Sequence, residues 1–154
     1  MLGDLRELYQ EVILEHGKHP RNRRQLKDAN RNAFGHNPMC GDALVVHLLV
    51  DDEHRIRDVA FEGEGCAISV ASASLMTETL KGKTEEEAKA LFDSFREMCT
   101  KDEAPDAPDV DPEALERLQV LSGVRAFPVR VKCATLAWHT MAAALKGQTE
   151  VSTE

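Results

Sequence analysis

The sequence predicts an α+β fold, and three observations support this prediction. Two strand-like runs, residues 43–50 and 55–63, stand in the first half of the chain. Helix-like patterns dominate the part that follows, and we find neither an internal repeat nor a linker long enough to separate two domains. A chain of 154 residues is long enough to bury one hydrophobic core. We therefore expect a single compact domain over residues 1–154.

Composition and charge exclude several classes of function. Nineteen basic residues against 27 acidic ones give a net charge of −8, whereas a nucleic-acid binder needs a basic face. No segment has the apolar length that spans a bilayer, and the first residues lack the pattern of a signal peptide. We expect a cytoplasmic protein that binds neither nucleic acid nor membrane.

The first element is predicted to be a helix that starts at Asp4, where the sequence has the spacing of a capping box. Gly17 and Pro20 would end it. Residues 21–41 are interpreted as an irregular connection. The basic stretch at its start, residues 17–24, is either a solvated loop or a docking patch for an acidic partner surface.

The two strand-like runs are predicted to form a hairpin, because the polar sequence DDEH separates them. Residues 43–50 are apolar on both faces, which indicates a central strand. Residues 55–63 alternate between apolar and polar positions. The glycines of GEG then lead into a helix over about residues 66–82.

The second half is predicted to be helical around one exposed loop. Thr84 starts a second capping box and a helix with an apolar stripe. Residues 101–114 are rich in Pro and Asp, so we expect a loop there. Asp111 would cap a short helix through Leu121, and Pro128 would open the last helix, followed by a frayed tail.

The four cysteines lie in different settings, and a reducing compartment favours metal or thiol chemistry over disulfides. Cys99 stands within an apolar stripe and is assigned to the core. Cys66 follows two glycines at a helix start, where unpaired N–H groups favour a thiolate. Cys133 lies on an apolar helix face, but Arg130 is one turn away. A core position and a metal-bound thiolate both fit Cys133.

Cys40 and Asp42 flank a glycine where a loop enters the first strand. Thiolate sulfur and carboxylate oxygen both bind zinc, and the glycine lets the backbone bend so that both side chains approach one point. With Cys66 and Cys133 they would form a tetrahedral set, and His36 could substitute for one ligand. The linear spacing is not diagnostic, and a globular domain that binds no metal also fits these residues.

Four ordered motifs then resemble a known family: HPRN, NPMCGD, EGEGCAISVASASLMTETLKGKTEEEA and FPVRVKCATLAWHT. They are similar to the IscU/NifU-N-like iron–sulfur cluster assembly proteins, and most closely to the SufU branch, over nearly the whole chain. The resemblance implies a three-stranded antiparallel sheet covered by helices. It also implies a metal site at one end of the fold, with Cys40, Asp42, Cys66 and Cys133 as ligands.

Two features favour the SufU branch within this resemblance. IscU scaffolds carry His immediately before the last cysteine ligand, whereas this chain has Lys132, a poor ligand for a transferable cluster. The loop and short helix around residues 101–121 resemble the insertion of SufU-type chains. The implied cofactor is therefore Zn²⁺, with a [2Fe–2S] cluster as the alternative.

The resemblance implies a sulfurtransferase-like role beside a PLP-dependent cysteine desulfurase of the SufS type. The protein would accept persulfide sulfur and pass it to downstream iron–sulfur assembly proteins. We expect Cys40 to be the acceptor, because a loop residue can swing out, and Arg130 to steer the anionic persulfide. A scaffold that assembles a [2Fe–2S] cluster and a non-catalytic interaction domain with a structural zinc are the two alternatives.

Overall fold

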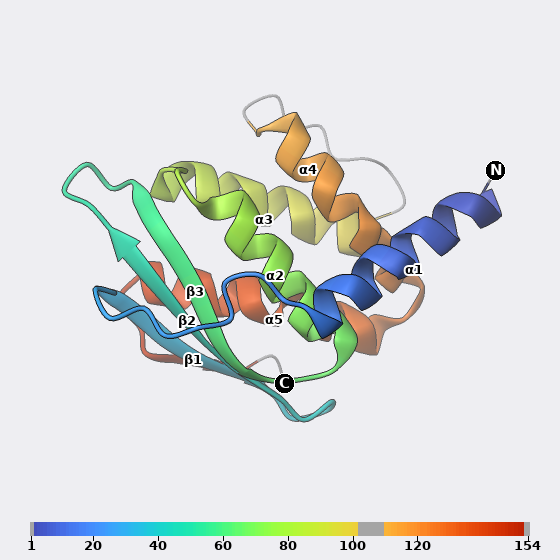
Figure 1. Cartoon of the computed structure of the whole chain (residues 1–154), viewed down its shortest axis with the longest axis horizontal. Helices are drawn as coiled ribbons and strands as arrows, with labels where there is room; N and C mark the ends of the chain where they lie inside the picture. The colour runs from blue at the N-terminus through green and yellow to red at the C-terminus, as the bar shows by residue number, and fades with distance from the viewer. Residues whose placement is uncertain (1, 102–109, 153–154) are drawn as a thin grey trace.

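One sheet with helices gathered against it makes up the computed structural model, which describes residues 2–101 and 110–152 (Figure 1). The elements in chain order are α1 (Leu2–Lys18), β1 (Arg31–Asn37), β2 (Asp42–Val50), β3 (Ile56–Glu64), α2 (Ala67–Leu80), α3 (Glu85–Thr100), α4 (Pro112–Leu118), the 3₁₀ helix η1 (Gln119–Ala126), α5 (Pro128–Leu145) and β4 (Glu150–Ser152).

The sheet has four strands in the order β3-β2-β1-β4. The first three strands pair antiparallel, whereas β4 pairs parallel to β1, with Phe34 opposite Glu150. The α+β class is thus confirmed, and β2 lies inside the sheet as predicted. The expectation of a sheet with three antiparallel strands is wrong, because β4 forms a fourth strand and covers the otherwise open edge of β1. The expectation of a frayed tail is wrong for the residues of β4.

Strand β1 lies inside the segment that was predicted to be irregular. Its buried positions are Ala33, Gly35 and Asn37, while Phe34 on the opposite face is 37% exposed. The strand therefore lacks the alternation of large apolar and polar side chains by which a strand is recognised in sequence. Its place in the sheet comes from tertiary pairing with β2.

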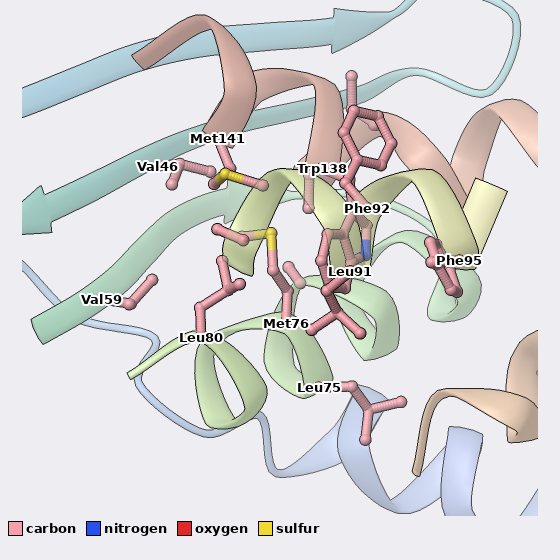
Figure 2. Packing of buried hydrophobic residues seen from close by; sticks show 14 of the residues in the cluster. Val46, Val59, Leu75, Met76, Leu80, Leu91, Phe92, Phe95, Trp138 and Met141 are labelled. Atoms are coloured by element: carbon pink, nitrogen blue, oxygen red, sulfur yellow. The ribbon is translucent and has the colours of Figure 1, made fainter. Parts of the chain in front are cut away.

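The core lies between the sheet and the helices. Helix α5 packs on β1 and β2, α2 packs on β3 and α5, and α1 packs on α2. Figure 2 shows the apolar side chains that fill this space, among them Phe92, Phe95 and Trp138. The Phe95 and Trp138 rings stack with centroids 5.0 Å apart, which is a favourable aromatic separation. Cys99 is fully buried in this cluster, as predicted.

The predicted helix starts are confirmed except at α1. Thr84 and Glu87 form both hydrogen bonds of a capping box, and the Asp111 carboxylate accepts the Glu113 N–H at 3.0 Å. Pro128 is the first residue of α5. Helix α1 already begins at Leu2, so Asp4 lies within its first turn and is not the N-cap. The loop predicted at 101–114 falls mostly on residues 102–109, which lie outside the described residues.

The basic stretch after α1 is anchored to the rest of the fold. Arg24 forms an ion pair with Asp58 of β3 at 2.9 Å, and Arg23 donates to the Gly63 carbonyl at 2.5 Å. Arg21 pairs with Glu15. These contacts fasten the α1–β1 connection along β3. Across residues 2–101 and 110–152, the longest apolar helical stretch falls short of what a membrane crossing needs.

Candidate metal centre

Three sequence-distant segments meet at one end of the sheet. Cys40 lies in the turn between β1 and β2, Asp42 is the first residue of β2, and Cys133 lies on α5. The antiparallel register places Asn37 directly opposite Asp42. Because α5 packs on both strands, it presents Cys133 to the hairpin that carries Cys40.

Two sulfur atoms and a carboxylate come close together here. The Cys40 and Cys133 sulfur atoms are 3.0 Å apart. Together with a carboxylate oxygen of Asp42 they form a group whose ligand atoms all lie within 4.8 Å of one another. Cys133 is fully buried and Asp42 is 1% exposed, whereas Cys40 is half-buried. The cluster thus opens to solvent at the Cys40 side.

Both carboxylate oxygens of Asp42 are held. Oδ1 accepts the Cys66 backbone N–H at 2.8 Å, and Oδ2 accepts a hydrogen from Asn37 Nδ2 at 3.3 Å. Gly65 permits this approach, because a Cβ there would lie 2.7 Å from Asp42 Oδ1. Gly41 has φ +71°, a backbone conformation that glycine adopts without strain, and so supports the predicted bend between Cys40 and Asp42.

Cys66 and His36 lie differently from the three close ligands. Cys66 is the N-cap of α2, as its predicted position at a helix start requires. Its thiol lies near Cys133, yet its sulfur is outside the group of mutually close ligand atoms in the described chain. His36 is also outside that group, and its ring stacks on Phe34 with centroids 5.8 Å apart.

The surroundings of the buried Cys133 thiol disfavour its charged form. Burial raises the pKa of the Cys133 thiol, and the neighbouring Cys40, Cys66 and Asp42 raise it further. The pKa of Arg130 is raised chiefly by the nearby Cys66 and also by Cys133. The exposed Arg130 guanidinium therefore lies beside the thiols of Cys66 and Cys133.

The residues present suit a thiophilic metal ion. Zinc binds thiolate sulfur at about 2.3 Å, so two thiolates on one ion are at most about 4.6 Å apart, and the Cys40–Cys133 separation lies within that limit. Two thiols and a carboxylate supply three ligands. The Cys66 thiol beside them would be a fourth after a change of side-chain position.

Asn37 is a residue of the site that sequence reasoning missed. Its side chain is fully buried, and Nδ2 lies 3.3 Å from Asp42 Oδ2 and 3.5 Å from Cys133 Sγ. The only local signal was its place three residues before Cys40 in HNPMCGD. An asparagine before a proline is more typical of a turn, so the motif alone indicated no contact with the ligands.

An α+β domain that gathers two thiols and a carboxylate at one end of its sheet has the ligand types of a thiolate metal site. Residues 8–152 of this chain match the family model of the NifU-like N terminal domain. The chain belongs to this family, whose members include proteins of iron–sulfur cluster assembly.

Relatives with two different descriptions align with most of the chain. It is 43% identical to the iron–sulfur cluster assembly scaffold protein IscU of Streptococcus pyogenes serotype M1, over 94% of this chain and 87% of the relative. It is 41% identical to the zinc-dependent sulfurtransferase SufU of Bacillus subtilis strain 168, over 90% of each.

A solved structure supports the same family. It is that of the protein assigned as the iron–sulfur cluster assembly scaffold of the SUF system in Fervidobacterium islandicum AW-1. This structure superposes with a TM-score of 0.76 at 33% identity and covers 88% of this chain and 94% of that one. The similarity therefore extends over most of the fold.

Proposed function

We propose that this protein is a zinc-dependent acceptor of persulfide sulfur that works with a PLP-dependent cysteine desulfurase in iron–sulfur cluster assembly. The observation that carries the proposal is the close approach of the Cys40 and Cys133 sulfur atoms beside Asp42. In this proposal Cys40, Asp42, Cys66 and Cys133 are the metal ligands. Sulfur passes from the acceptor to downstream iron–sulfur assembly proteins.

Zinc is the proposed ion because of the donor set and of one neighbouring residue. Thiolates and a carboxylate suit Zn²⁺, and when bound the ion lowers the pKa of its thiol ligands so that they are deprotonated. Lys132 precedes Cys133 at the position where a histidine would offer a further ligand. The similarity to the zinc-dependent sulfurtransferase SufU supports the same assignment.

Cys40 is the proposed acceptor because it is the more accessible of the two thiols among the three close ligands. It lies in a turn and is half-buried, whereas Cys133 is fixed on α5 and fully buried. The Cys40 thiolate attacks the outer sulfur of a donor persulfide. A new S–S bond forms on Cys40 as the donor S–S bond breaks, and the donor cysteine leaves as a thiolate, with no net oxidation.

Arg130 is proposed to attract the anionic donor. Its side chain is exposed at the mouth of the cluster and lies near the cysteine thiols. An arginine there raises the local concentration of an anionic group and partly offsets the charge of three thiolates and a carboxylate around one Zn²⁺, which sums to about −2.

The experiment that tests the proposal is a cysteine desulfurase assay with this protein zinc-loaded and metal-stripped. We expect only the zinc-loaded protein to raise the rate of alanine release and to carry labelled sulfur on Cys40. Equal rates with and without the protein, together with no labelled sulfur on Cys40, would refute it.

A second function is supported by the similarity to the scaffold protein IscU. In that case protein purified without air would contain iron and sulfide, in place of one zinc per chain. Metal and sulfide analysis therefore separates the two functions.

A further inference from the structure

The side-chain amide of Asn37 holds two of the three close ligands at once. Its Nδ2 donates to Asp42 Oδ2 at 3.3 Å and to Cys133 Sγ at 3.5 Å. An NH₂ group has two hydrogens, so both contacts can form together. The amide orientation follows from chemistry, because the reverse orientation would place Oδ1 against a carboxylate oxygen.

The other half of the same amide is left without a partner. Within the described residues, Asn37 Oδ1 is buried and accepts no hydrogen bond, although the side chain is fully enclosed. A buried polar atom without a partner is unfavourable for stability. Asn37 is thus unfavourable for folding stability at its oxygen, whereas its nitrogen supplies two donors to the candidate metal ligands.

We infer that Asn37 is a positioning residue for the metal centre, which holds the side chains of Asp42 and Cys133 in place while Cys40 remains free to react. The inference rests on the proposed function for its last clause. Asp42 is held on its other oxygen by the Cys66 N–H. The Asn37 amide hydrogen bonds in the described chain go to Asp42 and Cys133, and not to the Cys40 sulfur.

The Asn37 hydrogen bonds make the three close ligands differ in how firmly their side chains are held. Hydrogen bonds to a metal ligand fix its orientation, and their loss typically lowers metal affinity about 10- to 100-fold. With an ion bound, Asp42 and Cys133 would be held by the buried Asn37 donor group. The half-buried Cys40, which lies in a turn, would then be the ligand that is free to leave.

The test compares Asn37→Leu with the parent and with Asn30→Leu. Asn30 exchanges two hydrogen bonds with Val50, at 2.7 and 2.9 Å, near the far end of the same hairpin. Asn30→Leu therefore removes two side-chain hydrogen bonds, as Asn37→Leu does, but it changes no residue of the cluster. Asn37→Ala is the second variant, for use if leucine does not fit the space.

Zinc affinity is measured by competition with a chromogenic chelator, and Co²⁺ spectra report the thiolate ligands. We expect Asn37→Leu and Asn37→Ala to lower zinc affinity about 10-fold or more and to alter the Co²⁺ spectrum, with Asn30→Leu within twofold of the parent. Affinity within twofold for both Asn37 variants would overturn the inference. So would an equal loss in Asn30→Leu.

Alkylation of the zinc-loaded protein with iodoacetamide, followed by mass spectrometry, tests the inequality of the ligands. Cys40 should react at least several-fold faster than Cys133 in the parent, and the ratio should fall toward one in the Asn37 variants. A ratio unchanged by these variants contradicts the inference. If zinc affinity falls as expected but Cys40 receives no sulfur in the desulfurase assay, the proposed function fails while the positioning role stands.

Discussion

The sulfur atoms of Cys40 and Cys133 lie 3.0 Å apart although 93 positions separate the two residues in the chain. One lies in a hairpin turn and the other on α5, so their contact forms only when α5 is docked on the sheet. A metal ion held by both therefore binds the folded chain and not the unfolded one. The free energy of metal binding is then added to the free energy of unfolding.

Removal of zinc should therefore destabilise the protein. At free zinc about 1,000 times the dissociation constant, the ion adds about 4 kcal/mol to the free energy of unfolding. We expect urea unfolding of the chelated protein to have a lower midpoint, and zinc addition to restore it. A midpoint that does not move on zinc addition would show that the ion does not join Cys40 to Cys133.

Substitution Cys40→Ala should abolish sulfur acceptance, because the attacking thiolate is lost. The matched control is Cys99→Ala, since Cys99 is fully buried and burial raises its thiol pKa to about 12. That control should retain acceptance while losing about 1 kcal/mol of stability from the core. Radiolabelled sulfur transfer checks both, and normal labelling of Cys40→Ala would reject Cys40 as the acceptor.

The approach of Asp42 to the start of α2 depends on Gly65. A Cβ there would lie 2.7 Å from Asp42 Oδ1, so Gly65→Ala should displace the carboxylate and break its bond to the Cys66 N–H. We expect zinc affinity to fall about 10-fold or more. Gly123→Ala is the control, because a Cβ there meets nothing within 4 Å. Equal zinc affinities in the two variants would rule out this role of Gly65.

Arg130→Gln should slow sulfur acceptance without preventing zinc binding. The loss should be greatest at low ionic strength, because salt screens the attraction between an exposed arginine and an anionic donor. Arg96→Gln is the control, since Arg96 is exposed on α3 and pairs with Asp93 at 3.5 Å, away from the cluster. Transfer rates at several salt concentrations check this. A loss independent of salt would contradict steering by Arg130.

Local sequence patterns predicted most of the helices and two of the strands. The capping box at Thr84 and the proline at 128 mark helix starts through contacts between near neighbours, which sequence displays directly. Strand β1 was missed because its buried face carries Ala33, Gly35 and Asn37, so its pairing with β2 depends on residues elsewhere in the chain.

The candidate site also has a part that sequence predicted and a part that it did not. Cys40, Asp42 and Cys133 were predicted to approach one another, and the structure places them together. The sulfur of Cys66 lies outside that group, and local sequence does not predict this because a side-chain rotamer depends on tertiary packing. Asn37 was missed because its donors reach Asp42 across the hairpin and Cys133 across the sheet–helix interface. The ligand and acceptor roles remain predictions.

His16 should make stability depend on pH. It is 7% exposed, and its Nδ1 lies 2.7 Å from Ser74 Oγ on α2. Burial lowers its pKa, Arg21 lowers it further, and the nearby Glu78 and Glu15 offset part of this shift. The folded state therefore favours neutral His16. The stabilisation that neutral His16 contributes is complete above the pKa of about 6.5 that it has in the unfolded chain. It is lost as pH falls through the lower pKa of His16 in the folded protein.

The test of this pH dependence is urea unfolding of the parent and of His16→Gln between about pH 7.5 and 5. The parent should lose stability on acidification, by at most about 1.4 kcal/mol per pH unit for this one proton. His16→Gln should flatten the dependence, although the half-buried His139, whose pKa is also lowered by burial, leaves a remainder in the same direction. His19→Gln is the control, because His19 is exposed. Parallel pH profiles for the parent and His16→Gln would show that His16 is not the group that titrates.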